Sequence, residues 1–329
     1  MHRRQFLGLA MGTLAAGVVA GCASRIVRQG MATSQASSAP TDAAAWHAAR
    51  RFASTRFGNI AYVERGSGPA ALFLHGFPLN SFQWRGAFDR LSPYRRCVAP
   101  DSLGLGYTQV AEGQSVTPAD QVDMLVTLLD KLSIGSVDLI ANDSGGAVAQ
   151  LFVTRHPERV RTLLLTNCDV ENNCPPPAVL PVIELAHAGR FADEWLAPWV
   201  ADKSLARSDK GLGGMTFTYP DRLADETIDM YLHPLVESSH RKALTNAYAI
   251  GLAPNPLAGV EPALKRCAVP TRILWGTGDD IFSKDDPDYL DKTLPRSRGV
   301  RRIEGAKLFF PEEFPDVVAE EARRLWDVG

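Results

Sequence analysis

The sequence predicts an α/β protein with a mostly parallel sheet, flanking helices and a helical cap. From Phe52 onward, short β-rich runs alternate with amphipathic segments, and such alternation is typical of βαβ units. The strand rhythm stops between residues 175 and 262, where helical segments take over, and it returns at Thr271. An all-helical insertion in an α/β frame is typical of a lid over the carboxyl edge of the sheet, where ligands bind.

Local signals predict each element in turn. Thr117, Pro118 and Asp120 supply the N-cap, the first-turn proline and the capping-box acid of a helix start. The other elements expected in the first half are strands at 60–63, 71–74, 97–99, 137–141 and 163–165, and helices at 84–91 and 145–155. The second half is expected to hold helices at 179–188, 191–200 and 221–249, the last interrupted by Pro234, then strands at 271–275 and 300–303 and a helix at 314–326. We therefore divide the folded chain into a core at 52–174 and 263–329 and a cap at 175–262.

Composition limits the possible functions. The 329 residues are 45% hydrophobic and 22% charged, which is enough apolar material for a large core. Lys and Arg number 35 against 37 Asp and Glu, so the net charge is -2 and the basic excess that nucleic-acid binding needs is missing. The five cysteines form no CxxC pair, and we expect no structural metal. Their spacing leaves open whether Cys168 and Cys174 pair.

The first 22 residues resemble the export signal of a bacterial lipoprotein. Arg3 and Arg4 precede an apolar run that is too short for a permanent membrane span of about 20 residues. The segment Val19-Ala20-Gly21-Cys22 is similar to a lipobox, where the signal is cleaved and the cysteine is acylated. The resemblance implies a twin-arginine signal peptide over residues 1–21 and a lipid anchor at Cys22.

An anchor at that position has consequences for location and for the segment that follows. The protein is then expected in the bacterial cell envelope, bound to a membrane on its extracytoplasmic side. Residues 22–51 begin with a stretch rich in Ala, Ser and Gln, without apolar periodicity, and are expected to form a flexible tether.

The segment from Ala141 to Gly146 is expected to carry the chemistry. A strand that feeds a helix through a sharp turn needs small residues around a central residue, whose backbone is strained and whose side chain stands clear of the sheet. Counting back from Gly145 and Gly146 puts Asp143 at the central position. Ser144 is the alternative nucleophile, although the pattern of small residues would then shift by one.

On these motifs the chain resembles the α/β-hydrolase fold family, and within it the haloalkane dehalogenases and epoxide hydrolases, whose turn carries an aspartate. Leu74-His75-Gly76-Phe77-Pro78 looks like the family's oxyanion segment, and Trp275-Gly276-Thr277-Gly278-Asp279 like the segment that holds its acid. The resemblance covers residues 57 to 327. It implies that Asp143 is the nucleophile, that Asp279 is the acid with Asp169 as a second candidate, and that the N–H groups of Phe77 and Ser144 form an oxyanion hole.

The resemblance also implies a reaction and a class of substrate. A carboxylate displaces a leaving group from carbon to form an alkyl ester, and activated water then cleaves the ester. The expected substrate is a small apolar electrophile, namely an epoxide, an alkyl halide or an ester, and no cofactor is expected. Ser144 and Phe77 stand where haloalkane dehalogenases hold the halide, which disfavours that activity. Epoxide hydrolases use tyrosines of the cap to protonate the opening epoxide, and three are available in this cap: Tyr219, Tyr231 and Tyr248.

One part of the family's machinery is missing from the sequence. The segment that normally carries the catalytic histidine reads Gly305-Ala306-Lys307-Leu308, with Leu308 at the histidine position, and no histidine follows His240. The candidates for a substitute base are Lys307, His233 and His240. Three hypotheses therefore remain: a hydrolase that uses Asp143, a ligand-binding protein that has lost the base, and a serine esterase that uses Ser144.

Overall fold

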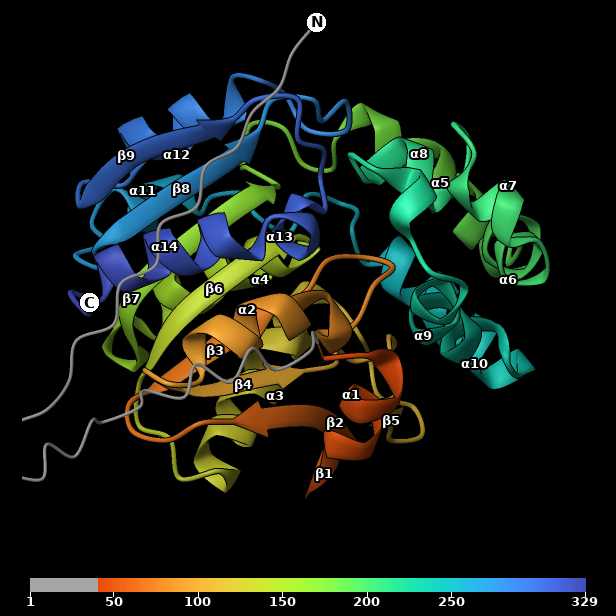
Figure 1. Ribbon diagram of the computed structural model, residues 1–329, viewed down its shortest axis with the longest axis horizontal. Coiled ribbons are helices and arrows are strands. Elements are labelled where there is room, and N and C mark those ends of the chain that lie inside the picture. The colour runs from red at the N-terminus through yellow and green to blue at the C-terminus, as the bar shows by residue number, and fades with distance from the viewer. Residues whose placement is uncertain (1–40) are drawn as a thin grey trace, which may run out of the picture. The chain divides into compact units, whose positions relative to one another are not determined.

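A nine-stranded sheet organises residues 41–329, the part of the chain that the computed structural model describes (Figure 1). The strands are β1 (Arg50–Thr55), β2 (Gly58–Arg65), β3 (Ala70–Leu74), β4 (Arg96–Pro100), β5 (Gln109–Val110), β6 (Val137–Asp143), β7 (Val160–Cys168), β8 (Thr271–Gly276) and β9 (Ser297–Ile303). Their order is β1-β2-β4-β3-β6-β7-β8-β9, with β5 beside β2. β2 pairs antiparallel with its neighbours, and every pair from β4 to β9 is parallel. The mostly parallel sheet is confirmed.

Helices cover both faces of the sheet (Figure 1). α2 (Arg85–Leu91) and α14 (Pro315–Leu325) pack together on one face, and α3 (Pro118–Lys131) and α4 (Ser144–Arg155) on the other. All seven residues of β6 are consequently buried, as expected for a central parallel strand. The capping box that was predicted at the start of α3 is present.

The chain between β7 and β8 forms a cap of helices beyond the carboxyl ends of the strands (Figure 1). Its main helices are α5 (Leu180–His187), α6 (Ala197–Ala201), α7 (Lys203–Arg207), α8 (Leu212–Thr216), α9 (Asp225–Val236) and α10 (Ser239–Ile250). The prediction that Pro234 interrupts the last long helix is wrong, because this proline lies inside α9 near its end. Proline there removes one backbone hydrogen bond, whereas the break occurs where Ser238 accepts the N–H of Arg241 and caps α10.

The expectation of a tether up to residue 51 is wrong at its C-terminal end. Residues Ala43–Ala49 form helix α1, which Asp42 caps by accepting the N–H of Ala45 at 2.7 Å. Trp46 is completely buried and packs edge-on against Phe88 at 5.0 Å between ring centroids. Trp46 is the one buried residue of this helix. The sequence of the helix therefore shows no apolar periodicity from which it could be predicted. The predicted signal peptide and Cys22 lie outside the described residues.

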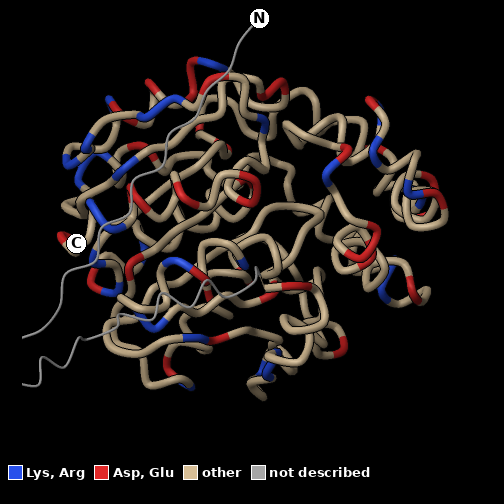
Figure 2. Tube along the Cα trace, in the orientation of Figure 1, with Lys and Arg blue, Asp and Glu red and all other residues tan. Residues whose placement is uncertain are grey.

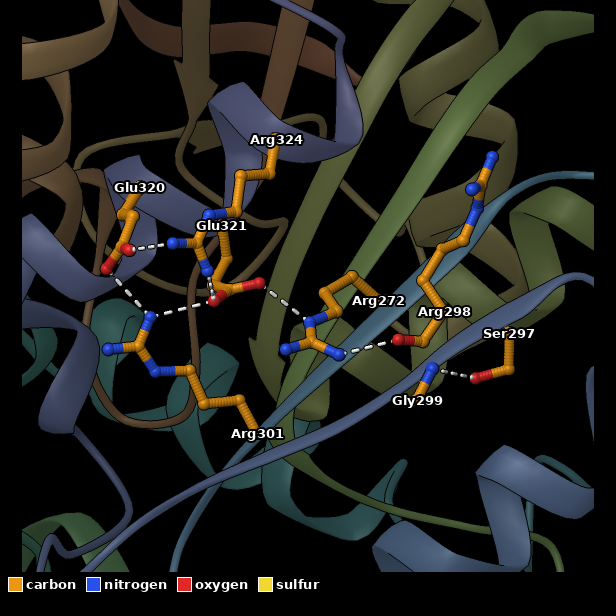
Figure 3. A network of polar contacts seen from close by, with 8 residues as sticks. All are labelled: Arg272, Ser297, Arg298, Gly299, Arg301, Glu320, Glu321 and Arg324. Atoms are coloured by element: carbon orange, nitrogen blue, oxygen red, sulfur yellow. Dashed lines mark hydrogen bonds and ion pairs between the residues drawn. The ribbon is translucent and has the colours of Figure 1, made fainter.

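Basic and acidic residues are interspersed along β9 and α14 (Figure 2), and a network of their side chains connects α14 to the sheet (Figure 3). Glu321 of α14 accepts hydrogen bonds from Arg272 on β8 and from Arg301 on β9, both at 2.7 Å. Arg324 also donates to Glu321, and Glu320 pairs with Arg301 and Arg324 at the more exposed edge of the network.

Between residues 41 and 329, no helix is long and apolar enough to cross a lipid bilayer.

Candidate active site

The turn between β6 and α4 is centred on Asp143. This residue has φ +55° and ψ −133°, a region that residues other than glycine seldom adopt. Ser144 already belongs to α4. A Cβ atom at Gly145 would lie 2.5 Å from the carbonyl oxygen of His75, and one at Gly146 would lie 2.3 Å from Cβ of Cys168. The two glycines therefore allow the turn to pack between the ends of β3 and β7.

Two backbone N–H groups hold the carboxylate of Asp143. The N–H of Phe77 donates to its Oδ1 at 2.7 Å, and the N–H of Ser144 also donates to this carboxylate. Burial raises the pKa of Asp143, and the hydrogen bonds from Ser144 and Phe77 oppose that rise by stabilising the ionised form. The structure thus brings together the expected nucleophile and both expected oxyanion donors.

Asp143 opens into a cavity of about 400 Å³ beneath the cap. Its wall is largely apolar, and the polar groups on it include Asp143, Ser144, Asp169 and Lys307. Three aromatic residues of the cap also line it, Phe191, Trp195 and Trp199, and adjacent rings lie within 6 Å. Sequence reasoning did not assign these residues, although their spacing of four could have identified one helical face. A site of this size and character suits a small apolar ligand.

The two candidate acids occupy different environments. Asp279 follows β8 and is buried outside the cavity wall, where it accepts hydrogen bonds from Asn167 Nδ2 at 2.8 Å and the N–H of Ile281 at 2.9 Å. Burial raises the pKa of Asp279 to about 6. Asp169 follows β7 and lines the cavity. Burial, together with the charge of Asp143, raises the pKa of Asp169 to about 7.

The structure does not bring His233 or His240 to Asp143, so the expectation that either serves as the base is wrong. They lie on the outer faces of α9 and α10 and are exposed to solvent, and neither lines the cavity. His233 instead faces Glu237 at 3.9 Å. Lys307 does line the cavity, but its ammonium group donates to the carbonyl oxygen of Gly214.

Leu308, at the position of the family's histidine, is buried in the cavity wall. Asn142 Nδ2 donates to its carbonyl oxygen at 3.2 Å and ties this loop to the end of β6. His75 is buried at the end of β3, where burial lowers its pKa. Its Nε2 accepts the N–H of Ser102 at 3.0 Å, and its Nδ1 lies 2.9 Å from the carbonyl oxygen of Gly76. Both ring nitrogens are therefore engaged in structural contacts.

Of the three cap tyrosines, only Tyr248 reaches the turn. Its hydroxyl lies 3.0 Å from Ser144 Oγ, and its ring stacks on Phe77 at 5.3 Å. Tyr231 is buried elsewhere, where its hydroxyl bonds to Glu312, and Tyr219 is 41% exposed. Cys168 and Cys174, whose pairing the sequence leaves open, are both unpaired thiols.

Comparisons with known proteins agree with this architecture. The alpha/beta hydrolase fold family profile matches residues 69–314. Haloalkane dehalogenase 2 of Mycobacterium tuberculosis (strain ATCC 25618 / H37Rv) is 27% identical over 283 residues, which cover 82% of this chain and 92% of the relative. Epoxide hydrolase 3 of Mus musculus is 27% identical over 67% of this chain and 59% of the relative.

Two further similarities are more limited in what they show. A haloalkane dehalogenase of Mesorhizobium japonicum is 42% identical, but over only 31% of this chain and 33% of the relative. The crystal structure of a haloalkane dehalogenase loop variant from Bradyrhizobium elkanii superposes with a TM-score of 0.67 and 23% identity, covering 84% of this chain and 96% of that one. At this identity, the superposition shows the fold alone.

Proposed function

This chain belongs to the alpha/beta hydrolase fold family and is related to haloalkane dehalogenases and epoxide hydrolases, and we propose that it uses Asp143 as a nucleophile on a small apolar electrophile. One observation carries the proposal: the strained residue at the end of β6 is an aspartate whose carboxylate faces an apolar cavity. A carboxylate there can attack an epoxide or alkyl halide carbon and form an ester.

The N–H groups of Phe77 and Ser144 support the second half of the reaction. They hold the carboxylate of Asp143 before reaction. When water attacks the ester, negative charge develops on an oxygen of the same group, and fixed donors at that place stabilise it. Ester formation needs no proton transfer when the leaving group is a halide, whereas ester hydrolysis needs a base. With Leu308 at the family's histidine position, another group has to act as that base.

The serine hypothesis has less support. Ser144 lies in α4, outside the strained position, and its hydroxyl shares a hydrogen bond with Tyr248 rather than with a histidine. A serine nucleophile needs an adjacent base to remove its proton. Neither His233 nor His240 lines the cavity that Ser144 faces. The ligand-binding hypothesis differs from the hydrolase only in whether a covalent ester forms, so it is decided by experiment.

When a reaction with excess 1-iodobutane is quenched early in acid, part of the wild-type protein is expected to carry one butyl group, at Asp143. Intact-protein mass spectrometry followed by peptide mapping measures this addition. Asp143→Asn should not be labelled, because the amide is a poor nucleophile, and asparagine has nearly the same shape as the aspartate that it replaces. Ser144→Ala is the matched control and should still be labelled. A label on Ser144 would support the serine esterase, and reversible binding with neither a label nor butanol release would support the ligand-binding protein.

We also propose that Cys22 carries a lipid anchor that holds this domain at the extracytoplasmic face of a bacterial membrane. The support is the pair Arg3 and Arg4 followed by the lipobox-like Val19-Ala20-Gly21-Cys22. In the native bacterium or a host with the same export route, the protein should fractionate with membranes, and Cys22→Ala should release it. Replacing both arginines by lysine should block export. Recovery of a soluble mature protein that retains Met1 would contradict the anchor.

A further inference from the structure

Two carboxylates stand next to each other at the cavity. Asp143 pairs in register with Cys168 across the parallel strands β6 and β7, so Asp169 follows immediately beyond this pair at the same sheet edge. Asp169 is 6% exposed and lines the cavity together with Asp143. Asp279 does not line it, because it is turned toward Asn167 and the N–H of Ile281. Asp209 of the cap and Asp280 after β8 also line the cavity, but Asp169 is the one that follows the strand next to β6.

The two carboxylates have different surroundings, and this difference favours a proton on one of them over the other. Asp143 receives the N–H groups of Phe77 and Ser144, which favour its ionised form. Burial raises the pKa of Asp169 and the charge of Asp143 raises it further, to about 7, although the Cys174 thiol donates to it. Asp143, Cys174 and Asp286 shift the pKa of Asp169, and the charge of Asp169 in turn raises the pKa values of Cys168 and Tyr248. These surroundings favour a proton on Asp169 over one on Asp143, and carboxyl pairs with such different surroundings take different roles in acid–base catalysis.

We propose that Asp169 is the general acid and then the general base of this site, in place of the absent histidine. The inference rests on the proposed function, in which Asp143 is the nucleophile. With an epoxide, an oxygen of Asp143 bonds to a ring carbon, the ring C–O bond breaks, and the proton of Asp169 moves to the released oxygen. The products of this step are a hydroxyalkyl ester on Asp143 and an ionised Asp169.

The second step returns both groups to their first state. Asp169 takes a proton from water while the water oxygen bonds to the ester carbonyl carbon. The tetrahedral intermediate collapses by breaking the bond to the alkyl oxygen, and Asp169 gives its proton to that oxygen to release a diol. Asp143 is left protonated, and its proton passes to Asp169. The balance is one epoxide and one water for one diol, with no other reactant.

The ester itself switches Asp169 from acid to base. Esterification removes the negative charge of Asp143, the larger of the two neighbouring charges that raise the pKa of Asp169. The pKa of Asp169 therefore falls in the ester, and its carboxylate ionises when a base is needed. Asp169 alternates between acid and base because the negative charge of Asp143 is lost when the ester forms and returns when the ester is cleaved.

Asp169→Asn separates the two steps when it is tested with 1-iodobutane and 1,2-epoxyhexane. Iodide leaves without a proton, so the variant should form the butyl ester at nearly the wild-type rate, but ester breakdown should be slower by about 100-fold or more. With the epoxide, ring opening should be slowed as well. Quenched intact-mass spectra follow the ester, and gas chromatography follows butanol and diol. Asp285→Asn removes a carboxylate at an exposed position and should behave as wild type.

Each outcome bears on one proposal. Equal ester breakdown in wild type and Asp169→Asn would overturn the role of Asp169 and leave Asp143 as the nucleophile, whereas no ester in either protein would overturn the proposed function. The pH profile of the wild type provides a test that does not depend on the folding of the variant. Epoxide opening should decline as the pH rises through about 7, the pKa of Asp169, and ester breakdown should rise with a midpoint below that value. Ester breakdown that does not change with pH would also overturn the inference.

Discussion

Leu308→His is expected to accelerate hydrolysis of the Asp143 ester by about 100- to 10,000-fold, the usual contribution of a positioned general base. Leu308 is 1% exposed and lines the same cavity as Asp143. Its backbone is held by the hydrogen bond from Asn142, so the new imidazole would start from a fixed position. The loop that carries Asp279 lies next to the loop that carries residue 308, because the N–H of Gly278 donates to the carbonyl oxygen of Ala306 at 2.9 Å.

The rate of ester hydrolysis should be measured in the Asp169→Asn variant. The butyl ester is expected to accumulate there, and its lifetime can be followed by mass spectrometry. Leu308→Asn is the matched control, because it adds polarity at the same place without a basic nitrogen. Adding Asp279→Asn to Leu308→His should remove most of the gain, since a carboxylate partner orients the imidazole and stabilises its charged form. A folded Leu308→His variant without any gain would mean that residue 308 does not face the ester.

Glu321→Gln is expected to lower the free energy of unfolding by about 3 kcal/mol, near the lower end of the range for removing one partner of a buried ion pair. The side chain of Glu321 is 3% exposed, and it binds Arg272, Arg301 and Arg324 (Figure 3). The expected loss of stability is near the lower end of that range because the side chains of Arg301 and Arg324 are 32% and 65% exposed, so water can solvate them when Glu321 is replaced. Urea denaturation of the folded domain measures the change.

Glu320→Gln is the matched control for this network. Glu320 binds Arg301 and Arg324 as well, but at the exposed edge of α14, where water competes with the pairing and screens it. Its replacement should change stability much less than that of Glu321. Equal losses from the two variants would contradict the assignment of Glu321 as the buried centre of the network.

The same network predicts a pH dependence with a definite sign. Burial alone would raise the pKa of Glu321, but the hydrogen bonds from Arg301 and Arg272 outweigh it, so the pKa lies below the ordinary value of 4.5. A lowered pKa in the folded state stabilises the fold above the pKa of the unfolded state, and this contribution is lost as the pH falls through the folded value. The difference in stability between wild type and Glu321→Gln should therefore shrink in acid.

Most of the fold could be predicted from local patterns, as the elements around the turn show. The capping box of α3, the buried run of β6 and the glycines after Asp143 each depend on neighbours in sequence, because helix caps, strand burial and sharp turns are decided by residues a few positions apart. Helix α1 escaped prediction because the burial of Trp46 against Phe88 depends on contacts from a distant part of the chain.

The sequence by itself determined the frame of the site: an aspartate at a sharp strand-to-helix turn, an oxyanion segment after β3, and a leucine where the family has its histidine. Only the tertiary structure decided which side chains meet there. His233 and His240 face solvent, Tyr248 alone of the three tyrosines contacts Ser144, and Asp169 lines the cavity that Asp279 does not. The reason is physical: turn and helix signals are local in the chain, whereas strand register and the packing of the cap over the sheet edge set the distances between residues far apart in sequence.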